Sequence, residues 1–397
     1  MATRDLTRSQ VSVSMFIERV FGHLPRTDQR YWAQAYLSGL LSTEGKKSVR
    51  RLAAAVSDSP TASQSMHQFV NASPWDWAPA RAELMRWTEE RLAPKAWTLD
   101  VAVMRKRGEH SCGVHRRFVP STGRSVNCQL GVGAFLTTET EAVPVDWGLL
   151  LPGSWLNDEQ RRARARIPAD ITTRAVDHHA LDLVDSLSAG SSLGDLPVVA
   201  DLTAYAGAGA LVRGLSRNGR GFVLAVPGRM PVVAGGPVTS RASMNTDLQA
   251  PVEAQRFFEL KHNSQIRLDT ATARDGRAGQ ASVVTGLVRL PEARVNRQAP
   301  HRTYRLFAVR HSAGRRSTQL WLTNMVHRRT DDLFALTQLR RRARAAVQSL
   351  EHDYGLLDFE GRSYPGWHHH MTLVSAAYAY SRVELAQTEP LRVPQAV

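Results

Sequence analysis

Two short apolar segments that each end in an aspartate constrain this chain more than any other feature. The first runs W-T-L-D-V-A-V-M-R-K-R-G-E-H-S-C-G-V, contains Asp100, and passes through a basic turn to Gly108; the second, L-P-V-V-A-D, ends at Asp201. Each pattern predicts a buried strand, the first continuing through a hairpin. Two nearby carboxylates repel each other unless a cation lies between them, and Mg²⁺ prefers such oxygen ligands. The alternative is that each aspartate only caps a strand or the following helix.

The charge of the chain indicates a polyanionic partner. Lys and Arg together number 51 and Asp and Glu 36, which leaves a net charge of +15. Nucleic acid is the first candidate for such a partner. Nearly all the cations are arginines, which suit phosphates and guanine edges, although an Arg- and Ala-rich composition is also typical of GC-rich genomes.

The small number of cysteines and the lack of long apolar runs predict the cellular location of the protein. Cys112 and Cys128 are too few for a disulfide framework or a zinc site, which favours a reducing cytoplasm. No apolar run is long enough to cross a bilayer, and the first ten residues hold no hydrophobic signal core. We therefore expect a soluble, cytoplasmic protein with no membrane partner.

The order of patterns along the chain predicts an α/β fold. Residues 10–95 have helical periodicity, with a basic helix, a polar turn at 57–61 and a second helix that together predict a helix-turn-helix-like unit or an ordinary helical bundle. Strands are expected over 97–151 and helices at 158–166 and 176–187, ahead of the Asp201 strand. A further strand follows at 221–226, then β-like runs, one more strand, and a long helix that begins near Asp331.

These patterns predict four segments. They are an N-terminal helical, DNA-binding domain at 1–95, the first part of the core at 96–229, a β-rich insertion at 230–318, and the C-terminal part of the core at 319–397.

Several motifs carry a resemblance to a known family. They are L-D-V-A-V-M-R-K-R-G-E-H-S-C-G-V, N-C-Q-L-G-V, V-P-V-D-W-G-L-L-L-P-G-S-W, V-V-A-D and G-L-L-D-F-E-G-R-S-Y-P-G-W-H-H-H-M-T-L. Through them the chain resembles the IS701-like group of DDE transposases, within the wider IS4-like set, over roughly residues 15–385. The resemblance implies a ribonuclease H-like core in which two aspartates and one glutamate hold two Mg²⁺ ions that activate water or a DNA 3′-hydroxyl. It also implies double-stranded DNA as partner and a homodimer, since paired DNA ends require paired subunits.

The family's catalytic triad is incomplete in this sequence. Asp100 and Asp201 match the first two acids and are the metal ligands if any metal binds, but the position of the third acid holds Arg344. Glu351 lies seven residues further along the helix, about 10 Å away, and Glu360 lies beyond the expected helix end. A guanidinium at position 344 would bridge the two carboxylates in place of metal. We therefore predict a cleavage-defective protein and consider Mg²⁺ doubtful.

The remaining functional residues are assigned to DNA or to the core. Trp147, Trp155, Trp321, Trp367 and the run His368 to His370 are expected to be structural, because adjacent helical histidines cannot share one ion. The arginine cluster of the long helix suits phosphate contact or, alternatively, a solvated face. The predicted DNA contacts are Lys106, Arg107, Arg340, Arg341, Arg342, Arg344 and Arg362.

Three classes of function remain open at this point. The first, which we favour, is a transposase-derived, nucleoid-associated DNA-binding protein that has lost cleavage. The second is an active Mg²⁺-dependent transposase that uses Glu351 or Glu360 as its third acid. The third is an enzyme repurposed for other chemistry, for which the sequence holds no motif.

Overall fold

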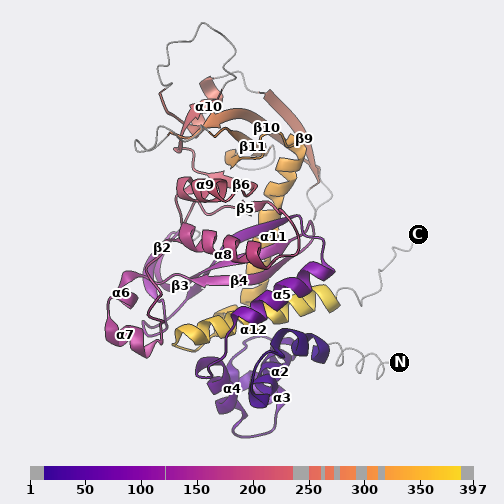
Figure 1. The fold of residues 1–397 in the computed structure, drawn as a ribbon, viewed down its shortest axis with the longest axis vertical. Helices are drawn as coiled ribbons and strands as arrows, with labels where there is room; N and C mark the ends of the chain where they lie inside the picture. The colour runs from indigo at the N-terminus through magenta and orange to yellow at the C-terminus, as the bar shows by residue number, and fades with distance from the viewer. Residues whose placement is uncertain are drawn as a thin grey trace, which may run out of the picture. The chain divides into compact units, whose positions relative to one another are not determined.

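The structure is a computed structural model that describes residues 13–120, 122–235, 250–260, 264–271, 278–291, 302–311 and 318–385 (Figure 1). Spatial contacts divide the chain into two compact units, one formed by residues 1–194 with 341–397 and the other by residues 195–340. The four sequence-based segments remain a prediction.

The first unit begins with the helices expected from the sequence. After a helix at residues 13–21, they are α2 (Thr27–Ser42), α3 (Val49–Val56), α4 (Ala62–Asn71) and α5 (Ala78–Arg91). Helices α3 and α4 pack against each other and are joined by residues 57–61, where the polar turn was expected. The helical prediction for this region is confirmed, and both of its interpretations, helix-turn-helix-like unit and helical bundle, fit this arrangement.

The strands of the first unit are built around one long strand. They are β1 (Ala96–Arg105), β2 (His115–Val119), β3 (Arg124–Thr137) and β4 (Ala142–Leu149). Strand β3 pairs antiparallel with the other three. Its residue Cys128 faces Arg105 of β1 on one side and His115 of β2 on the other.

The predicted hairpin after β1 is wrong, because β1 and β2 do not pair but lie on opposite edges of β3. Both are antiparallel to β3, so they run in the same direction. Residues 111–114, expected in a strand, form a turn closed by the amide of Val114 donating to Ser111 O over 3.1 Å. Gly113 adopts a φ of +81° there, a conformation that suits glycine and does not continue a strand.

Helix α12 (Tyr364–Tyr380) forms the core of the first unit. Every residue of it except Pro365 is buried, and it packs against β4, α2, α4 and α5 (Figure 1). The Ser363 hydroxyl caps its first turn by accepting from the amide of Gly366 over 3.1 Å. A helix enclosed on all sides needs apolar or fully paired side chains around its circumference. Shorter helices α6 (Gly153–Leu156) and α7 (Glu159–Arg164), with the longer α8 (Val176–Gly190), complete the connection between β4 and the second unit.

The histidines of α12 have structural roles, as expected. His370 lies 3.0 Å from the Tyr36 hydroxyl through Nδ1 and 3.1 Å from Gly355 O through Nε2. His369 lies 2.8 Å from the carbonyl oxygens of Val70 and of Trp75. These contacts join α12 to α2, to α4 and to the segments beside them. The four tryptophans assigned to the core are likewise buried, at 2% exposure or less.

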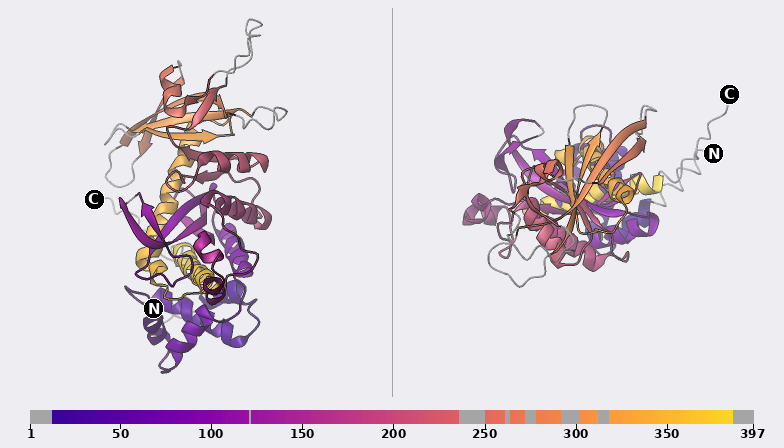
Figure 2. Two further views of the ribbon diagram at one scale, coloured as in Figure 1. Left: turned by 90° about the vertical axis from the view of Figure 1, so that its left-hand side faces the viewer. Right: turned by 90° about the horizontal axis from the view of Figure 1, so that it is seen from above.

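The second unit contains a mixed sheet. Its strands are β5 (Val198–Ala200), β6 (Phe222–Val226), β7 (Pro231–Ala234), β8 (Val252–Glu253), β9 (Ser264–Ala271), β10 (Ala278–Arg289), β11 (Tyr304–His311) and β12 (Thr318–Thr323). The order is β5-β6-β12-β11-β10, with β9 and β7 both on β10 and β8 on β7. Strands β5 and β6 are parallel, whereas the other pairs within this unit are antiparallel. Helix α9 (Ala208–Arg217) packs on β6, and α10 (Ala254–Leu260) lies beside β7 and β8 (Figure 2).

The long helix α11 (Thr330–Asp353) follows β12, as predicted. Asp331 and Asp332 occupy its first turn, where the helix dipole favours negative charge. The division between the two units falls within this helix, after Arg340. Among the described helices, none is long and apolar enough to cross a membrane.

The helices and strands of the two units confirm the predicted α/β class as a mixed α/β fold with a large mixed sheet.

Candidate functional site

Asp201 follows the buried strand β5 and forms a closed cluster of polar side chains. Its Oδ2 accepts from Arg340 Nη1 and from Gln319 Nε2, each over 2.9 Å. Arg340 Nη2 also donates to Gln319 Oε1 over 3.0 Å, which closes a ring of three hydrogen bonds. The other carboxylate oxygen, Oδ1, accepts from the Thr203 hydroxyl over 2.7 Å. We call Asp201, Gln319 and Arg340 the Asp201 cluster.

Three elements of the second unit supply this cluster. Asp201 comes from the end of β5, Gln319 from β12 and Arg340 from α11. The Arg340 guanidinium also lies 5.7 Å from the ring centroid of the buried Trp321. The side chains of Arg340 and Asp201 remain 35% and 22% exposed. The pair is thus partly open to solvent and to a ligand, and its two charges cancel.

The donor set around Asp201 does not fit a divalent metal ion. Mg²⁺ requires several oxygen ligands whose lone pairs point at the ion, whereas both oxygens of Asp201 already accept hydrogen bonds. A cation at Oδ2 would also meet the guanidinium of Arg340. Within the residues that the structure describes, no three His, Cys, Asp or Glu side chains are grouped so that they could hold a metal.

Asp100 lies in β1, directly opposite Gly133 of β3. Its Oδ1 accepts from the amide of Val101 over 2.7 Å. Trp147 of β4 faces Gly133 from the other side, and a Cβ atom at Gly133 would come within 2.6 Å of the Trp147 ring. The glycine is therefore needed to seat the Trp147 ring over β3.

Arg344, at the position expected for the third acid, contacts the same strand as Asp100. Its Nη1 makes a long hydrogen bond of 3.4 Å to Val101 O. The ion pair seen at Asp201 belongs instead to Arg340, one helical turn earlier. The predicted bridging of both aspartates by Arg344 remains a prediction.

The two alternative acids occupy different environments in the first unit. Burial raises the pKa of Glu351, although the nearby Arg344 opposes that shift. Glu360 is exposed and lies 3.9 Å from Lys46 Nζ. Glu351 is thus half-buried beside a cation, and Glu360 is a surface residue.

The other predicted DNA contacts differ in how freely their side chains can reach a ligand. Lys106 donates from Nζ to Phe359 O over 2.7 Å, and burial lowers its pKa to about 8. Arg342 donates from Nε to Glu139 O over 2.8 Å. Three further members of the set are exposed: Arg107, Arg341 and Arg362.

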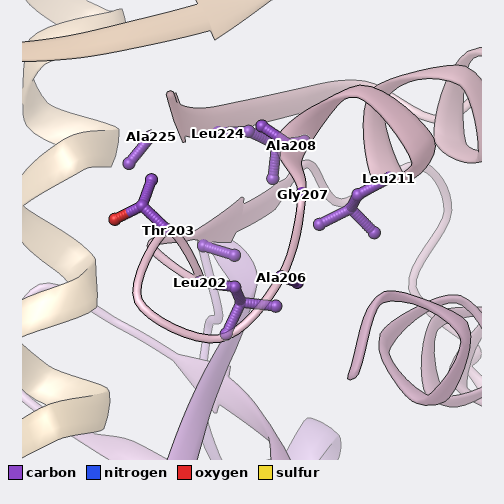
Figure 3. A pocket seen from close by; sticks show the side chains of 9 residues that line it. Leu202, Thr203, Ala206, Gly207, Ala208, Leu211, Leu224 and Ala225 are labelled. Carbon is purple, nitrogen blue, oxygen red and sulfur yellow. The ribbon is translucent and has the colours of Figure 1, made fainter. Parts of the chain in front are cut away.

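Two pockets lie near Asp201 in the second unit. The first is a small, largely apolar pocket lined by residues that follow Asp201 and by the start of α9 (Figure 3). Its only polar side chain is Thr203, so it suits packing better than nucleotide binding. The second is a more polar pocket that includes Asp201, Gln255, Arg310 and Gln319.

The roles of two members of the Asp201 cluster, Gln319 and Arg340, do not follow from the sequence. Gln319 was not singled out, because a glutamine at a strand start carries no distinctive signal. Arg340 was predicted to contact DNA but not to pair with Asp201. Its position one helical turn before Arg344 was the available signal, since residues four apart share a helix face.

These features define a mixed α/β protein with one candidate acid on β1 of the first unit and another at the end of β5 in the second. The family model of the DDE superfamily endonuclease matches residues 19–286, well over half of the chain. The chain therefore belongs to the DDE superfamily endonuclease family. The matched range contains both Asp100 and Asp201 and ends before α11. A search of curated proteins found no match.

Proposed function

We propose that this chain is a transposase-derived DNA-binding protein of the IS701-like group, with a ribonuclease H-like core, that has lost strand cleavage. The observation that carries the proposal is the engagement of Asp201 by Arg340 and Gln319, each 2.9 Å from the same carboxylate oxygen. A DDE endonuclease depends on divalent metal, and metal catalysis requires that oxygen as a ligand.

The charge balance at the candidate site supports the same proposal. A guanidinium and a carboxylate form a strong, charge-assisted hydrogen bond. Arg340 therefore supplies Asp201 with the positive charge that a metal would supply in an active relative. By the count along the sequence, Arg344 occupies the position of the family's third acid, so a cation stands where cleavage needs an anion. DNA phosphates still find a favourable surface in a chain of charge +15.

The partner in this proposal is double-stranded DNA, held by phosphate contacts from the predicted set of lysine and arginine residues. A cytoplasmic, nucleoid-associated location follows from such a partner, and a homodimer would place two copies on paired DNA ends. Phosphate contacts release counterions, so affinity depends on salt.

The test is a measurement of DNA affinity against salt, with the duplex that flanks the protein's own gene. We expect the dissociation constant to rise steeply between low and moderate salt, with a log-log slope of about 0.9 for each phosphate contact. An affinity that stays flat over that range, or no binding at all, would contradict the proposal.

A further inference from the structure

The hairpin of β2 and β3 extends beyond the end of β1. Strand β1 stops at Arg105, which faces Cys128, whereas β2 pairs with β3 as far as Arg124. Residues 124–127 of β3 therefore have β2 as their only strand partner among the described residues. These residues and β2 form a two-stranded ribbon, which we call the β2–β3 ribbon.

The outer face of the ribbon carries side chains of the types that often contact nucleic acid. Alternation along a strand places Arg116 and Phe118 on one face, opposite Asn127 and Ser125 of β3. Phe118 is 56% exposed, although it is a large apolar side chain. Arginine and asparagine are common partners of guanine and adenine edges, and phenylalanine contacts the thymine methyl group.

The charge of the ribbon is uniformly positive or neutral. From residue 110 to residue 138 the sequence contains no Asp or Glu, but it contains Arg116, Arg117 and Arg124. Within the part of the chain that the structure describes, neither Arg116 nor Arg124 forms an ion pair or a side-chain hydrogen bond. By contrast, the exposed Arg174 is paired with Asp182. Arg116 lies on the face of Phe118, whereas Arg124, opposite Val119, lies on the other face of the ribbon. These two arginines, which have no countercharge, complement a polyanion, and Phe118 complements its apolar base edges.

The turn of the ribbon keeps its tip narrow. The amides of Thr122 and Gly123 both donate to Val119 O over 3.0 Å, and Gly123 adopts a φ of +64°. A Cβ at Gly123 would meet no atom within 4 Å, so space does not require glycine there, but the backbone conformation favours it. Val119 O thus accepts from two amides across the turn, and the space beside Gly123 is open.

We propose that the β2–β3 ribbon docks into the major groove of duplex DNA, with Phe118 on base edges and with Arg116 and Arg124, from opposite faces of the ribbon, on phosphates. The major groove admits a two-stranded ribbon, whereas the minor groove is about half as wide. This inference rests on the proposed DNA-binding function and assigns to it a surface outside the predicted set of contacts.

The test uses the full chain and a duplex of about 30 base pairs, long enough for several helical turns, from the flank of its own gene. Affinity is measured by fluorescence anisotropy across a salt series. The proteins are wild type, the double variant R116Q/R124Q, F118A, and the controls R174Q and L287A. Leu287 of β10 is a matched control because it is a surface apolar residue, 39% exposed, that lies outside the predicted DNA-binding domain.

Each phosphate contact adds about 0.9 to the slope of log affinity against log salt concentration. We therefore expect R116Q/R124Q, which removes two such contacts, to reduce that slope by about 1.8. F118A should weaken binding severalfold without changing the slope. Both controls should bind like wild type. Wild-type protein should protect guanine N7, in the major groove, from dimethyl sulfate, and methyl green should displace it better than netropsin.

Two outcomes would overturn this inference alone and leave the proposed DNA-binding function standing. If the ribbon variants bind the duplex with the slope and affinity of R174Q and L287A, the ribbon is not the docking surface, although the protein still binds DNA. If protection falls on adenine N3 instead, the ribbon is in the minor groove and the proposal is wrong. Absence of binding by wild type would overturn the proposed function, and this inference with it.

Discussion

Two arginine–aspartate pairs, one in each unit, have the same chemistry and different surroundings. Arg81 of α5 pairs with Asp146 of β4 over 2.7 Å, with side chains only 6% and 19% exposed. The same guanidinium donates to Trp147 O, to the Thr372 hydroxyl and to His368 O. Arg340 pairs with Asp201 over 2.9 Å, but its side chain is 35% exposed and it has only Gln319 as a second hydrogen-bond partner among the described residues.

The difference in burial indicates that the Arg81–Asp146 pair, and not the Arg340–Asp201 pair, supports the fold. A buried guanidinium whose hydrogen bonds reach β4 and α12 holds those elements together, and its removal leaves a buried charge and several unpaired acceptors. A half-exposed pair contributes little to stability, because water screens it. Arg340 therefore affects mainly the chemistry of Asp201.

The largest expected effect is on the buried pair. Replacing Arg81 with methionine should destabilise the protein by about 3–5 kcal/mol, because Asp146 is left without its countercharge. Urea unfolding of R81M beside R86M measures this, since Arg86 is exposed and pairs with Glu83 at the surface. Equal midpoints for the two variants would contradict a structural role for Arg81.

The second expected effect is a dependence of stability on pH, caused by the buried His370 of α12. Burial, with a contribution from Lys106, lowers the pKa of His370 to about 3. The unfolded chain has a histidine pKa of about 6.5, so between these values it binds a proton that the folded chain does not. Stability is therefore complete above pH 6.5 and falls as the pH is lowered towards 3, by about 2 kcal/mol at pH 5 for this one group.

The measurement is the free energy of unfolding at pH 7.5 and at pH 5 for wild type and for H370N. The variant should lose less stability on acidification, even if it is less stable at both pH values because its contacts with Tyr36 and Gly355 change. A loss on acidification as large as that of wild type would show that His370 does not titrate as the burial indicates.

Breaking the partly exposed Arg340–Asp201 pair should have a small effect on the stability of the fold and a larger effect on the affinity for metal. Replacing Arg340 with glutamine should change the free energy of unfolding by less than about 1 kcal/mol. The same change removes the cation beside Asp201 Oδ2, so Mn²⁺ should bind at least about tenfold more tightly, a gain of about 1.4 kcal/mol. Calorimetric titration of R340Q, with R340Q/D201N as control, measures it.

Two results would contradict these expectations for Arg340. If Mn²⁺ binds R340Q no better than wild type, Arg340 does not block the site. If R340Q is destabilised as strongly as R81M, the contrast between the two pairs does not hold.

Local patterns predicted most of the elements, and long-range packing accounts for the errors. Periodicity located β1, α8 and α11, and the structural role of His368 to His370 followed from the rule that adjacent helical histidines cannot share one metal ion. The predicted hairpin failed because the sequence of residues 106–114 does not reveal that β3 is long enough to pair with β1 on one edge and β2 on the other. The same reason explains the Arg340–Asp201 pair, whose members are far apart in the sequence.

The Arg81 network was not predicted either, since an arginine in an amphipathic helix is usually at the surface. Its partners come from β4 and α12, so its burial is visible only after these elements have packed. The identity of Asp100 and Asp201 as candidate acids, by contrast, could be proposed from two short segments, because each combines an apolar strand with one carboxylate. Their catalytic use remains a proposal.

The most direct test of the account is a cleavage assay on the flanking DNA of the protein's own gene, with Mg²⁺ or Mn²⁺. Wild type is compared with D201A and with the double variant R340Q/R344E, and DNA binding is measured in parallel. We expect wild type to bind the DNA and leave it uncut. Cleavage by wild type that D201A abolishes would contradict the account and show an active transposase with a different third acid.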